Sequence, residues 1–316
     1  MSARIFIDGA VGTTGLQIKS RLQGRADIEL VSLAEAVRKD ANARADILNS
    51  VDVAILCLPD AAAVEAVAMI TNPNVKVIDA STAHRVADGW AYGFAELDAN
   101  QRGVIAGAKR VSNPGCYAVA SISILHPLVS AGLVAADFGV TINAISGYSG
   151  GGKQMIASFE DAGGDNAKTP YFVYGLSLNH KHVPEIQAHV GLTHQPLFVP
   201  SVGHFAQGMI VQIPLPLWSL PSAPSAAEVH AALTEHYLGQ RFVTVAGLDE
   251  TATMARLEPE ALNGTNELRL HVFAGPGQDG DQVVVMALLD NLGKGASGSC
   301  VQNLNVILGL DEAAGL

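Results

Sequence analysis

The sequence predicts an α/β protein that begins with a doubly wound parallel sheet and continues into a second, α+β domain. Two observations support this prediction. Short apolar strands alternate with alanine-rich helical stretches over residues 4–79, and a glycine-rich turn links the first strand to the first helix. Such alternation is typical of a parallel sheet covered by helices on both faces.

The strands of the first part are expected at residues 4–8, 28–33, 51–58 and 75–79. A helix is expected after the glycine turn, at residues 16–22, and another at 61–69. Cys57 falls inside the third strand, so we expect it in the core.

The turn after the first strand reads Gly9-Ala10-Val11-Gly12-Thr13-Thr14-Gly15. A strand, a glycine-rich turn and a helix are what a dinucleotide pyrophosphate requires, because glycines allow close backbone approach and the helix N-terminus supplies N–H donors. The spacing is G-x-x-G-x-x-G rather than G-x-G-x-x-G, so a tight turn without a ligand remains the alternative. The expected cofactor contacts are Gly9, Val11, Gly12, Thr13, Thr14 and Gly15.

The residues after the second strand bear on which nicotinamide cofactor binds. An acidic side chain there favours NAD, whereas basic groups suit the 2′-phosphate of NADP. Glu35 comes late for the first role, and Arg38 and Lys39 follow it. The sequence therefore favours NADP(H), with Arg38 as a contact, although all three residues suit an ordinary solvated helix as well.

A reactive cysteine is predicted in the segment Asn113-Pro114-Gly115-Cys116-Tyr117. Pro114 and Gly115 force a turn, and the following residues have apolar positions at helical spacing. Cys116 therefore opens a helix, where free N–H groups and the positive end of the dipole favour a thiolate. A thiolate there is a nucleophile for acyl chemistry. The alternative is a buried cysteine at a helix start.

Three further polar positions are candidates for the site. Arg85 follows the fourth strand and can clamp a phosphate or carboxylate, or form a surface ion pair. Ser149 and Lys153 lie in a glycine cluster that suits an anion-binding nest or a flexible loop. His204 follows a glycine in a turn before a strand, which makes it the expected partner of Cys116.

The second part is expected to hold strands at residues 138–146, 210–213, 268–273 and 282–288, the last two forming a hairpin. Helices are expected at 226–237 and from the end of a glycine-rich segment to Leu310. The proline-rich residues 214–224 are expected to connect elements over the surface. Cys300 is expected to be packed in the last helix. His180 and His182 lack a completing ligand, so no metal site is predicted.

Composition excludes several classes of partner. The chain has 316 residues, 16% of them charged, and a net charge of −11, which argues against nucleic acid. No apolar stretch is long enough to span a membrane, and Arg4 leads into a strand rather than a signal peptide. Three cysteines without paired spacing fit a reducing compartment. We therefore expect a cytoplasmic protein.

The motifs of the chain and the order in which they occur resemble those of the N-acetyl-γ-glutamyl-phosphate reductases, and in particular their shorter class. The more distant resemblance is to the aspartate-semialdehyde dehydrogenases. The matching segments cover nearly the whole chain: residues 9–15, 81–85 with 89–97, 112–117, 147–153, 180–186, 200–208 and 290–298.

The resemblance implies a Rossmann-like domain of residues 1–112 plus about 293–316 and a catalytic and dimerisation domain of 113–292. It implies that Cys116 attacks an acyl phosphate, that hydride from NADPH reduces the thioester, and that His204 is the acid/base. A departure concerns His204, because longer reductases carry the histidine directly after a proline, where this chain has Ser201. The resemblance also assigns Lys294 and Gly295 to the cofactor, and Arg85, Asn113, Ser149 and Lys153 are the substrate and phosphate candidates. A homo-oligomer, dimer or tetramer, is expected from the family.

The expected reaction is reduction of N-acetyl-γ-glutamyl phosphate to N-acetylglutamate 5-semialdehyde in arginine biosynthesis. The nearest alternative is the same chemistry on a 2-aminoadipate derivative, because one methylene is worth only about 1–3 kcal/mol of discrimination. A cysteine hydrolase or transferase without a redox cofactor, and a dinucleotide-sensing regulator, are the alternatives from other classes.

Overall fold

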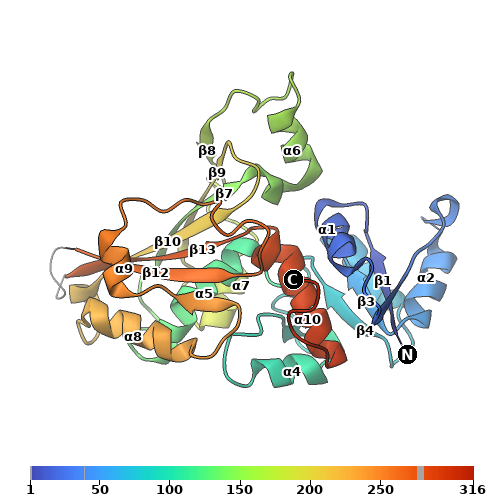
Figure 1. The fold of residues 1–316 in the computed structure, drawn as a ribbon, viewed down its shortest axis with the longest axis horizontal. Coiled ribbons are helices and arrows are strands. Elements are labelled where there is room, and N and C mark those ends of the chain that lie inside the picture. Colours follow the sequence, from blue (N-terminus) through green and yellow to red (C-terminus); the bar gives the residue numbers. More distant parts are fainter. Residues whose placement is uncertain (1, 39, 276–280) are drawn as a thin grey trace. The chain divides into compact units, whose positions relative to one another are not determined.

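The structure is a computed structural model that describes residues 2–38, 40–275 and 281–316 (Figure 1). Its internal contacts divide the chain into two units. The first unit contains residues 1–95, 99–115 and 296–316, and the second contains 96–98 and 116–295. The chain therefore passes between the units four times.

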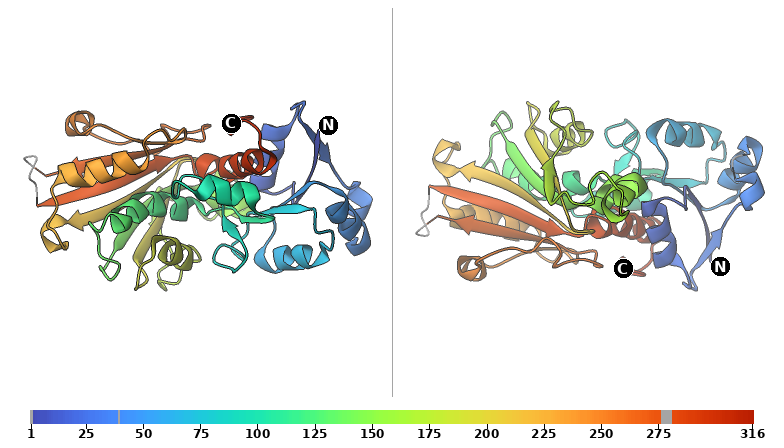
Figure 2. Two further views of the ribbon diagram at one scale, coloured as in Figure 1. Left: turned by 90° about the horizontal axis from the view of Figure 1, so that it is seen from below. Right: turned by 90° about the horizontal axis from the view of Figure 1, so that it is seen from above.

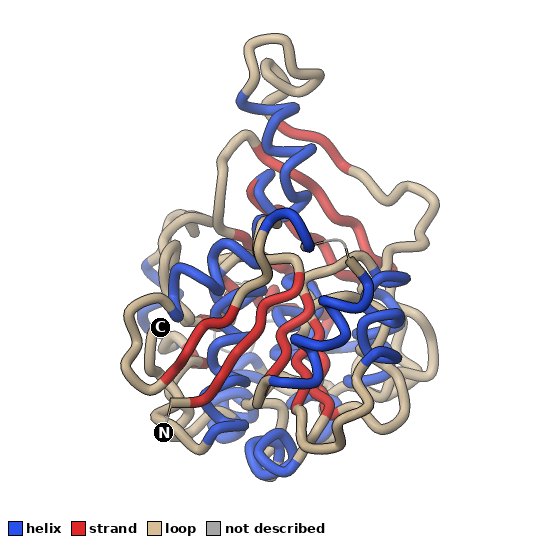
Figure 3. Tube along the Cα trace, turned by 90° about the vertical axis from the view of Figure 1, so that its right-hand side faces the viewer, coloured by secondary structure: helices blue, strands red, loops and turns tan. Residues whose placement is uncertain are grey.

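The first unit consists of a six-stranded sheet and its helices. Its strands are β1 (Ala3–Asp8), β2 (Ile28–Val31), β3 (Val53–Leu56), β4 (Lys76–Asp79), β5 (Ala91–Tyr92) and β6 (Arg110–Ser112), and its helices are α1 (Thr13–Leu22), α2 (Ala41–Ser50), α3 (Asp60–Met69), α4 (Gln101–Gly107) and α10 (Gly298–Leu308). A 3-10 turn, Glu35–Val37, follows β2. The sheet order is β2-β1-β3-β4-β6-β5 and every pairing is parallel. Figure 3 shows strands of this sheet as red tubes lying side by side.

Helices cover both faces of this sheet. On one face Ile5, Ile55 and Ile78 pack with residues of α1 and α10. On the other face the sheet packs with Leu48 of α2 and Ala66 of α3. Burying each large aliphatic side chain contributes roughly 1.5–3 kcal/mol. The predicted doubly wound parallel sheet is confirmed, and α10 adds the C-terminal residues to its core.

The second unit is built on a seven-stranded mixed sheet of order β11-β12-β13-β10-β7-β9-β8. Its strands are β7 (Thr141–Gly147), β8 (Tyr171–Val173), β9 (Leu197–Gly203), β10 (Met209–Pro216), β11 (Val243–Val245), β12 (Leu268–Ala274) and β13 (Gln282–Leu289), and its helices are α5 (Cys116–Ser130), α6 (Gly152–Glu160), α7 (Val183–Val190), α8 (Ala226–His236) and α9 (Leu248–Thr253). β12 and β13 pair antiparallel, as predicted, and the turn between them lies partly outside the described residues.

The prediction that residues 214–224 only connect elements is wrong at its start. Pro214 and Pro216 belong to β10, where they pair with Val284 and Gln282 of β13. β7 pairs with β10 only as far as Gln212, so the end of β10 has a single neighbour. A strand with one neighbour can lose an N–H donor on its open side, and proline is tolerated there.

The two faces of this sheet differ in burial. α5 packs on β10 and β13, and α8 packs on α5 and β12 (Figure 2). Side chains on the face toward these helices, such as Val211 and Val285, are fully buried. On the opposite face, Asn143, Gln212 and Met286 lie in register across three strands and are half-buried.

Within the described residues, every helix is too short or too polar to cross a membrane. The same residues contain no cluster of three or more His, Cys, Asp or Glu side chains suited to a metal ion.

His236, at the end of α8, should make folding sensitive to mild acid. Its Nε2 bonds to the carbonyl of Leu97 at 3.0 Å. Burial, and then the neighbouring His126, lower the pKa of His236 below its usual value of about 6.5. The unfolded chain then binds this proton more readily, so stability is fully present above about pH 6.5 and falls as the pH drops toward the lowered pKa. Urea unfolding measures the free energy of unfolding at pH 8 and at pH 5.5. Between these two pH values it should fall less for His236→Asn than for the unmodified chain, and an equal fall in both would contradict the assignment.

Candidate active site

Cys116 is the first residue of α5, as predicted, and it is half-buried. Pro114 and Gly115 precede it, and almost every side chain from Tyr117 to Leu125 is buried. The helix therefore starts at a fixed point under a packed core. The N–H groups of its first turn and its positive dipole end lie at Cys116, where they favour the thiolate.

Two neighbours restrict the space around Cys116. A Cβ atom placed on Gly295 would lie 2.7 Å from the Cβ of Cys116, so only glycine allows this close approach. Tyr174 is close enough to respond to the charge of Cys116. Burial first, with the Cys116 charge adding to it, raises the pKa of Tyr174 to about 12.

Next to Cys116, the side chain of Tyr117 is surrounded by rings. The centroids of His180, His182 and Phe198 lie 5.9, 5.8 and 5.2 Å from that of Tyr117. The Tyr117 hydroxyl donates to the carbonyl of Ser201 at 3.2 Å, and Tyr174 donates to Tyr117 at 3.3 Å. We call Tyr117, Tyr174, His180, His182 and Phe198 the Tyr117 cluster. It brings two imidazoles against the ring of Tyr117, the residue after Cys116.

In the first unit, the glycine turn has the geometry of a phosphate cradle. Gly9 has a φ of +89°, and a Cβ there would lie 2.2 Å from the carbonyl oxygen of Cys57. A Cβ on Gly15 would lie 2.4 Å from the carbonyl oxygen of Gly9. Gly12 precedes α1 and donates its N–H to Gly9 at 3.0 Å. No side chain caps α1 and its first turn has no acidic residue, so its N–H groups suit an anion.

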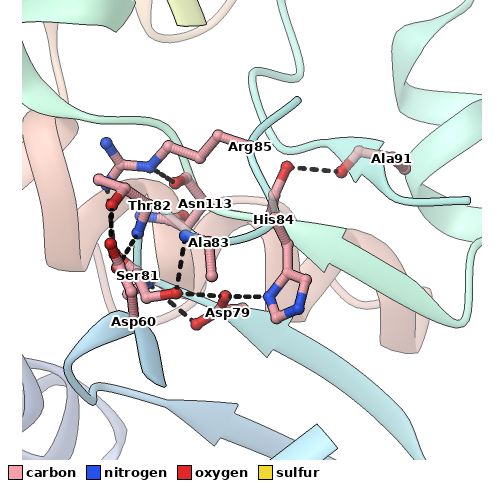
Figure 4. A network of polar contacts seen from close by, with 11 residues as sticks. Asp60, Asp79, Ser81, Thr82, Ala83, His84, Arg85, Ala91 and Asn113 are labelled. Carbon is pink, nitrogen blue, oxygen red and sulfur yellow. Dashed lines mark hydrogen bonds and ion pairs between the residues drawn. The ribbon is translucent and has the colours of Figure 1, made fainter. Parts of the chain in front are cut away.

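The carboxyl end of β4 carries a buried network around Asp79 (Figure 4). Asp79 is fully buried and accepts from the Ser81 backbone N–H at 2.9 Å and hydroxyl at 2.6 Å. It also meets Nδ1 of His84 at 2.6 Å, and His84 stacks on Trp90 at 4.1 Å. Thr82 bonds to Asp60 through both its backbone N–H and its hydroxyl. These contacts fix the loop at the sheet edge where open α/β folds place ligands.

Two family models match the chain. The model described as semialdehyde dehydrogenase, NAD binding domain, matches residues 34–104, and the semialdehyde dehydrogenase dimerisation domain matches 116–291. An N-acetyl-gamma-glutamyl-phosphate reductase of Trichormus variabilis is 52% identical over 320 residues, with 99% of each chain covered. One of Rhizobium etli is 54% identical over 310 residues, with 98% of this chain and 99% of the relative covered. This chain belongs to the N-acetyl-γ-glutamyl-phosphate reductases. The predicted family is confirmed.

Solved structures show the same fold for this reductase. Aspartate semialdehyde dehydrogenase II of Vibrio cholerae superposes with a TM-score of 0.72 at 14% identity, covering 98% of this chain and 99% of the other. Aspartate semialdehyde dehydrogenase of Candida albicans, solved with NADP, gives a TM-score of 0.64 at 13% identity, covering 98% and 99%. The predicted combination of a parallel-sheet domain and a mixed-sheet domain is therefore shared with the semialdehyde dehydrogenases.

The role of His204 as the partner of Cys116 stays a prediction, and the contacts of its side chain are with other residues of the second unit. His204 is exposed, its Nδ1 lies 3.0 Å from the carbonyl of Thr169, and its ring packs edge-on against Phe159 and Tyr148. The Tyr117 cluster instead contains His180 and His182. Two histidines before a helix suit proton transfer as well as metal binding.

The predicted anion nest at residues 147–153 is wrong for its first part. The N–H groups of Gly147, Tyr148 and Ser149 donate to carbonyls of residues 205–208, so they are already used within the sheet. The Ser149 hydroxyl is buried and accepts from Asn291 at 3.1 Å. Lys153 is exposed on α6.

The Lys294 side chain is engaged inside the second unit, and the cofactor contact of its segment stays a prediction. Its Nζ lies 2.9 and 2.8 Å from the two carboxylate oxygens of Glu96, and both side chains are buried. A buried ammonium held by both oxygens of a carboxylate is not available to a cofactor phosphate. The backbone of the next residue, Gly295, lies against the side chain of Cys116.

Arg85 and Asn113 hold the chain that leads to Cys116. The Nε of Arg85 donates to the carbonyl of Asn113 at 3.1 Å, and Nη2 donates to Ala80 at 3.2 Å. The Asn113 side chain donates to the carbonyl of Ala296 at 3.0 Å and accepts from Asn303 at 3.1 Å. Both residues therefore have structural partners within the first unit, whatever substrate contacts they add.

The residues after β2 leave the 2′-phosphate prediction on Arg38. Arg38 lies 3.2 Å from the carboxylate of Glu35, in a solvent-exposed pair, and Lys39 lies outside the described residues. Sequence reasoning missed Arg44, which lies 2.8 Å from the carboxylate of Asp8 at the end of β1. An acidic residue at a strand end and a basic residue on the next helix but one give no local signal of such pairing.

The glycine turn supports a comparison between two substitutions. Gly15→Ala should lower stability by about 1–3 kcal/mol, because the added Cβ collides with backbone inside the protein. Gly12→Ala should leave the melting temperature nearly unchanged, because the nearest atom to its Cβ is 3.4 Å away. If a pyrophosphate lies on this turn, Gly12→Ala should still weaken NADPH binding by about tenfold, roughly 1.4 kcal/mol. NADPH fluorescence titration checks this, and unchanged affinity in Gly12→Ala would remove the cofactor from the turn.

Proposed function

We propose that the chain reduces N-acetyl-γ-glutamyl phosphate to N-acetylglutamate 5-semialdehyde and phosphate, with NADPH as reductant, in arginine biosynthesis. The observation that carries the proposal is a half-buried cysteine at the start of a buried helix. It occurs in a chain that is more than half identical to reductases of this name over nearly its whole length.

Cys116 is the proposed nucleophile. Its thiolate attacks the γ-carbonyl, a C–S bond forms, and the C–O bond to phosphate breaks, which leaves a thioester. Bound NADPH supplies the hydride that reduces this thioester. The backbone N–H groups at the start of α5 are the proposed donors to the carbonyl oxygen that gains negative charge. Collapse of the hemithioacetal then breaks the C–S bond and releases the aldehyde and the Cys116 thiolate.

Reduction of the thioester leaves a hemithioacetal oxyanion, which takes a proton from a donor, and the same group accepts that proton back when the C–S bond breaks; the reverse reaction uses the two roles in the opposite order. We assign this exchange to the pair His180 and His182 in place of His204. Support comes from their ring contacts with Tyr117, the residue after Cys116. His180 also lies 5.8 Å, between ring centroids, from Tyr174, which responds to the charge of Cys116.

NADP(H) is the cofactor, and the proposed contacts are the glycine turn at residues 9–15 and Arg38. The turn suits a pyrophosphate. Only glycine fits the backbone packing at positions 9 and 15, and Gly12 leaves space beside the N–H groups of α1. This assigns dinucleotide binding to the first unit and acyl transfer to the second.

A homodimer through the second unit is the proposed assembly. The row Asn143, Gln212, Met286 and His271 runs in register across β7, β10, β13 and β12 on the face opposite α5. A second copy would cover Asn143, Gln212 and Met286, which are half-buried, whereas His271 is already buried within the chain. The matching family model is described as a dimerisation domain. The cytoplasm is the proposed location, in keeping with three free cysteines.

The reverse reaction tests the proposed function. N-acetylglutamate 5-semialdehyde should reduce NADP only when phosphate is present, and NAD should be a poorer acceptor. Activity with the N-acetyl-2-aminoadipate homologue alone would keep the chemistry and change the substrate. Absence of NADP reduction with both aldehydes would contradict the proposal.

A further inference from the structure

A buried ion pair joins two segments of the second unit that are far apart in sequence. Residues 96–98 enter this unit from the first unit and return, and Lys294 stands just before the chain leaves it after Gly295. The Lys294 ammonium bonds to both oxygens of Glu96, at 2.9 and 2.8 Å. The two side chains are only 1% and 0% exposed.

Both partners are held by further contacts within the unit. The Lys294 ammonium lies 5.5 Å from the centroid of the Phe242 ring, a cation–π distance. On the other side, His236 of α8 bonds to the carbonyl of Leu97, directly after Glu96. The pair is therefore fixed at both ends and cannot shift without moving its neighbours.

Lys294 is directly bonded to the residue that touches the nucleophile. The Gly295 backbone lies so close to Cys116 that an added Cβ would be 2.7 Å from the Cys116 Cβ and 3.3 Å from its Cα. The Gly295 N–H donates to the carbonyl of Asp290 at 2.9 Å. Lys294 and Gly295 lie in a π-helical turn, Gly293–Ser297, and such turns often mark functional positions.

We propose that the Glu96–Lys294 ion pair is a positioning device for Cys116. It holds Lys294, Lys294 holds the Gly295 backbone, and Gly295 closes one side of the Cys116 side chain so that its sulfur keeps one direction. A buried ion pair adds little net stability compared with apolar residues, so fixing a geometry is a better account of this one. The inference rests on Cys116 as the proposed nucleophile.

The test removes both charges together, because a single unpaired charge in this position would unfold the chain for an unrelated reason. The variant is Glu96→Leu with Lys294→Met. A matched control, Arg256→Gln with Glu258→Gln, removes an exposed ion pair from the same unit. Iodoacetamide labelling followed by peptide mass spectrometry counts reactive Cys116 and gives its alkylation rate. Turnover is then expressed per reactive Cys116, so that loss of folded protein does not count as loss of rate.

In the double variant we expect kcat per reactive Cys116 to fall about 100-fold with KM changed less than threefold, because misplacing a reacting group by about 1 Å has an effect of this size. The alkylation rate should change as well, and the control should match the unmodified chain. Gly295→Ala should give a similar loss, and combining it with the double variant should add less than tenfold, because both act through one displacement. Lys294→Arg with Glu96→Asp, which keeps an ion pair, should recover part of the rate and covers the case in which the apolar variant does not fold.

Unchanged kcat and alkylation rate in a folded double variant would overturn the inference, as would fully multiplicative losses with Gly295→Ala. If the unmodified chain fails to turn over any substrate, the proposed function fails. The alkylation rates still decide whether the ion pair positions Cys116, so the two failures are distinguishable.

Discussion

Cys116→Ser is expected to abolish turnover, lowering kcat by about 10⁴-fold or more, as is usual for the loss of a covalent nucleophile. Serine at a helix start is not ionised at neutral pH, whereas the thiolate of cysteine is favoured there. An oxygen ester is also a poorer hydride acceptor than a thioester. The melting temperature and NADPH affinity should stay near those of the unmodified chain, because the substitution changes one atom of a half-buried side chain.

Cys300→Ser is the matched control for this experiment. Cys300 is fully buried in the core of the first unit, and burial raises the pKa of its thiol well above the usual value. Its substitution should lower stability and leave kcat of the folded enzyme unchanged. More than about 1% of the original activity in Cys116→Ser would correspond to less than about 2.7 kcal/mol of lost transition-state stabilisation, which is too little for a nucleophile.

The second large effect is expected in the histidine pair. His180→Asn and His182→Asn are compared with His204→Asn, and the acid/base of the pair should cost about 10²–10⁴-fold in kcat. The matching limb of the pH–rate profile should disappear in that variant. His204→Asn should lose less than tenfold, because its recorded contacts are with Thr169, Phe159 and Tyr148. A large loss only in His204→Asn would restore the assignment made from the sequence.

Much of the first unit could be predicted because its signals are local. An apolar run followed by Gly9 and then by a helical pattern predicts a strand, a turn and a helix. Parallel strands that are buried on both faces are also recognisable as continuous apolar runs. Glycine is required in this turn because of close contacts within the segment itself and with Cys57. β10 was predicted too short because the tolerance for Pro214 and Pro216 depends on where β7 stops pairing, which is a property of the sheet.

The site was predictable only where one segment determines it. The position of Cys116 at a helix start could be predicted from the turn before it and the helix after it. The ion pair of Lys294 could not be predicted, because its partner, Glu96, stands 198 positions away in the sequence and meets it only in the folded unit. The contacts of the Ser149 loop could not be predicted either, because the carbonyls that accept its N–H groups belong to residues 205–208. His204 was chosen from its turn, while the contacts that select His180 and His182 come from Tyr117 on another element.

Trapping the acyl-enzyme tests the central claim most directly. The enzyme would be mixed with N-acetyl-γ-glutamyl phosphate without NADPH, quenched in acid, and analysed by intact-protein and peptide mass spectrometry with parallel phosphate determination. We predict an N-acetylglutamyl group on the peptide that contains Cys116, with phosphate released in equal amount. Adding NADPH before the quench should discharge the group as the semialdehyde. Phosphate release without a modified Cys116, or a modification that NADPH does not discharge, would contradict the thioester mechanism.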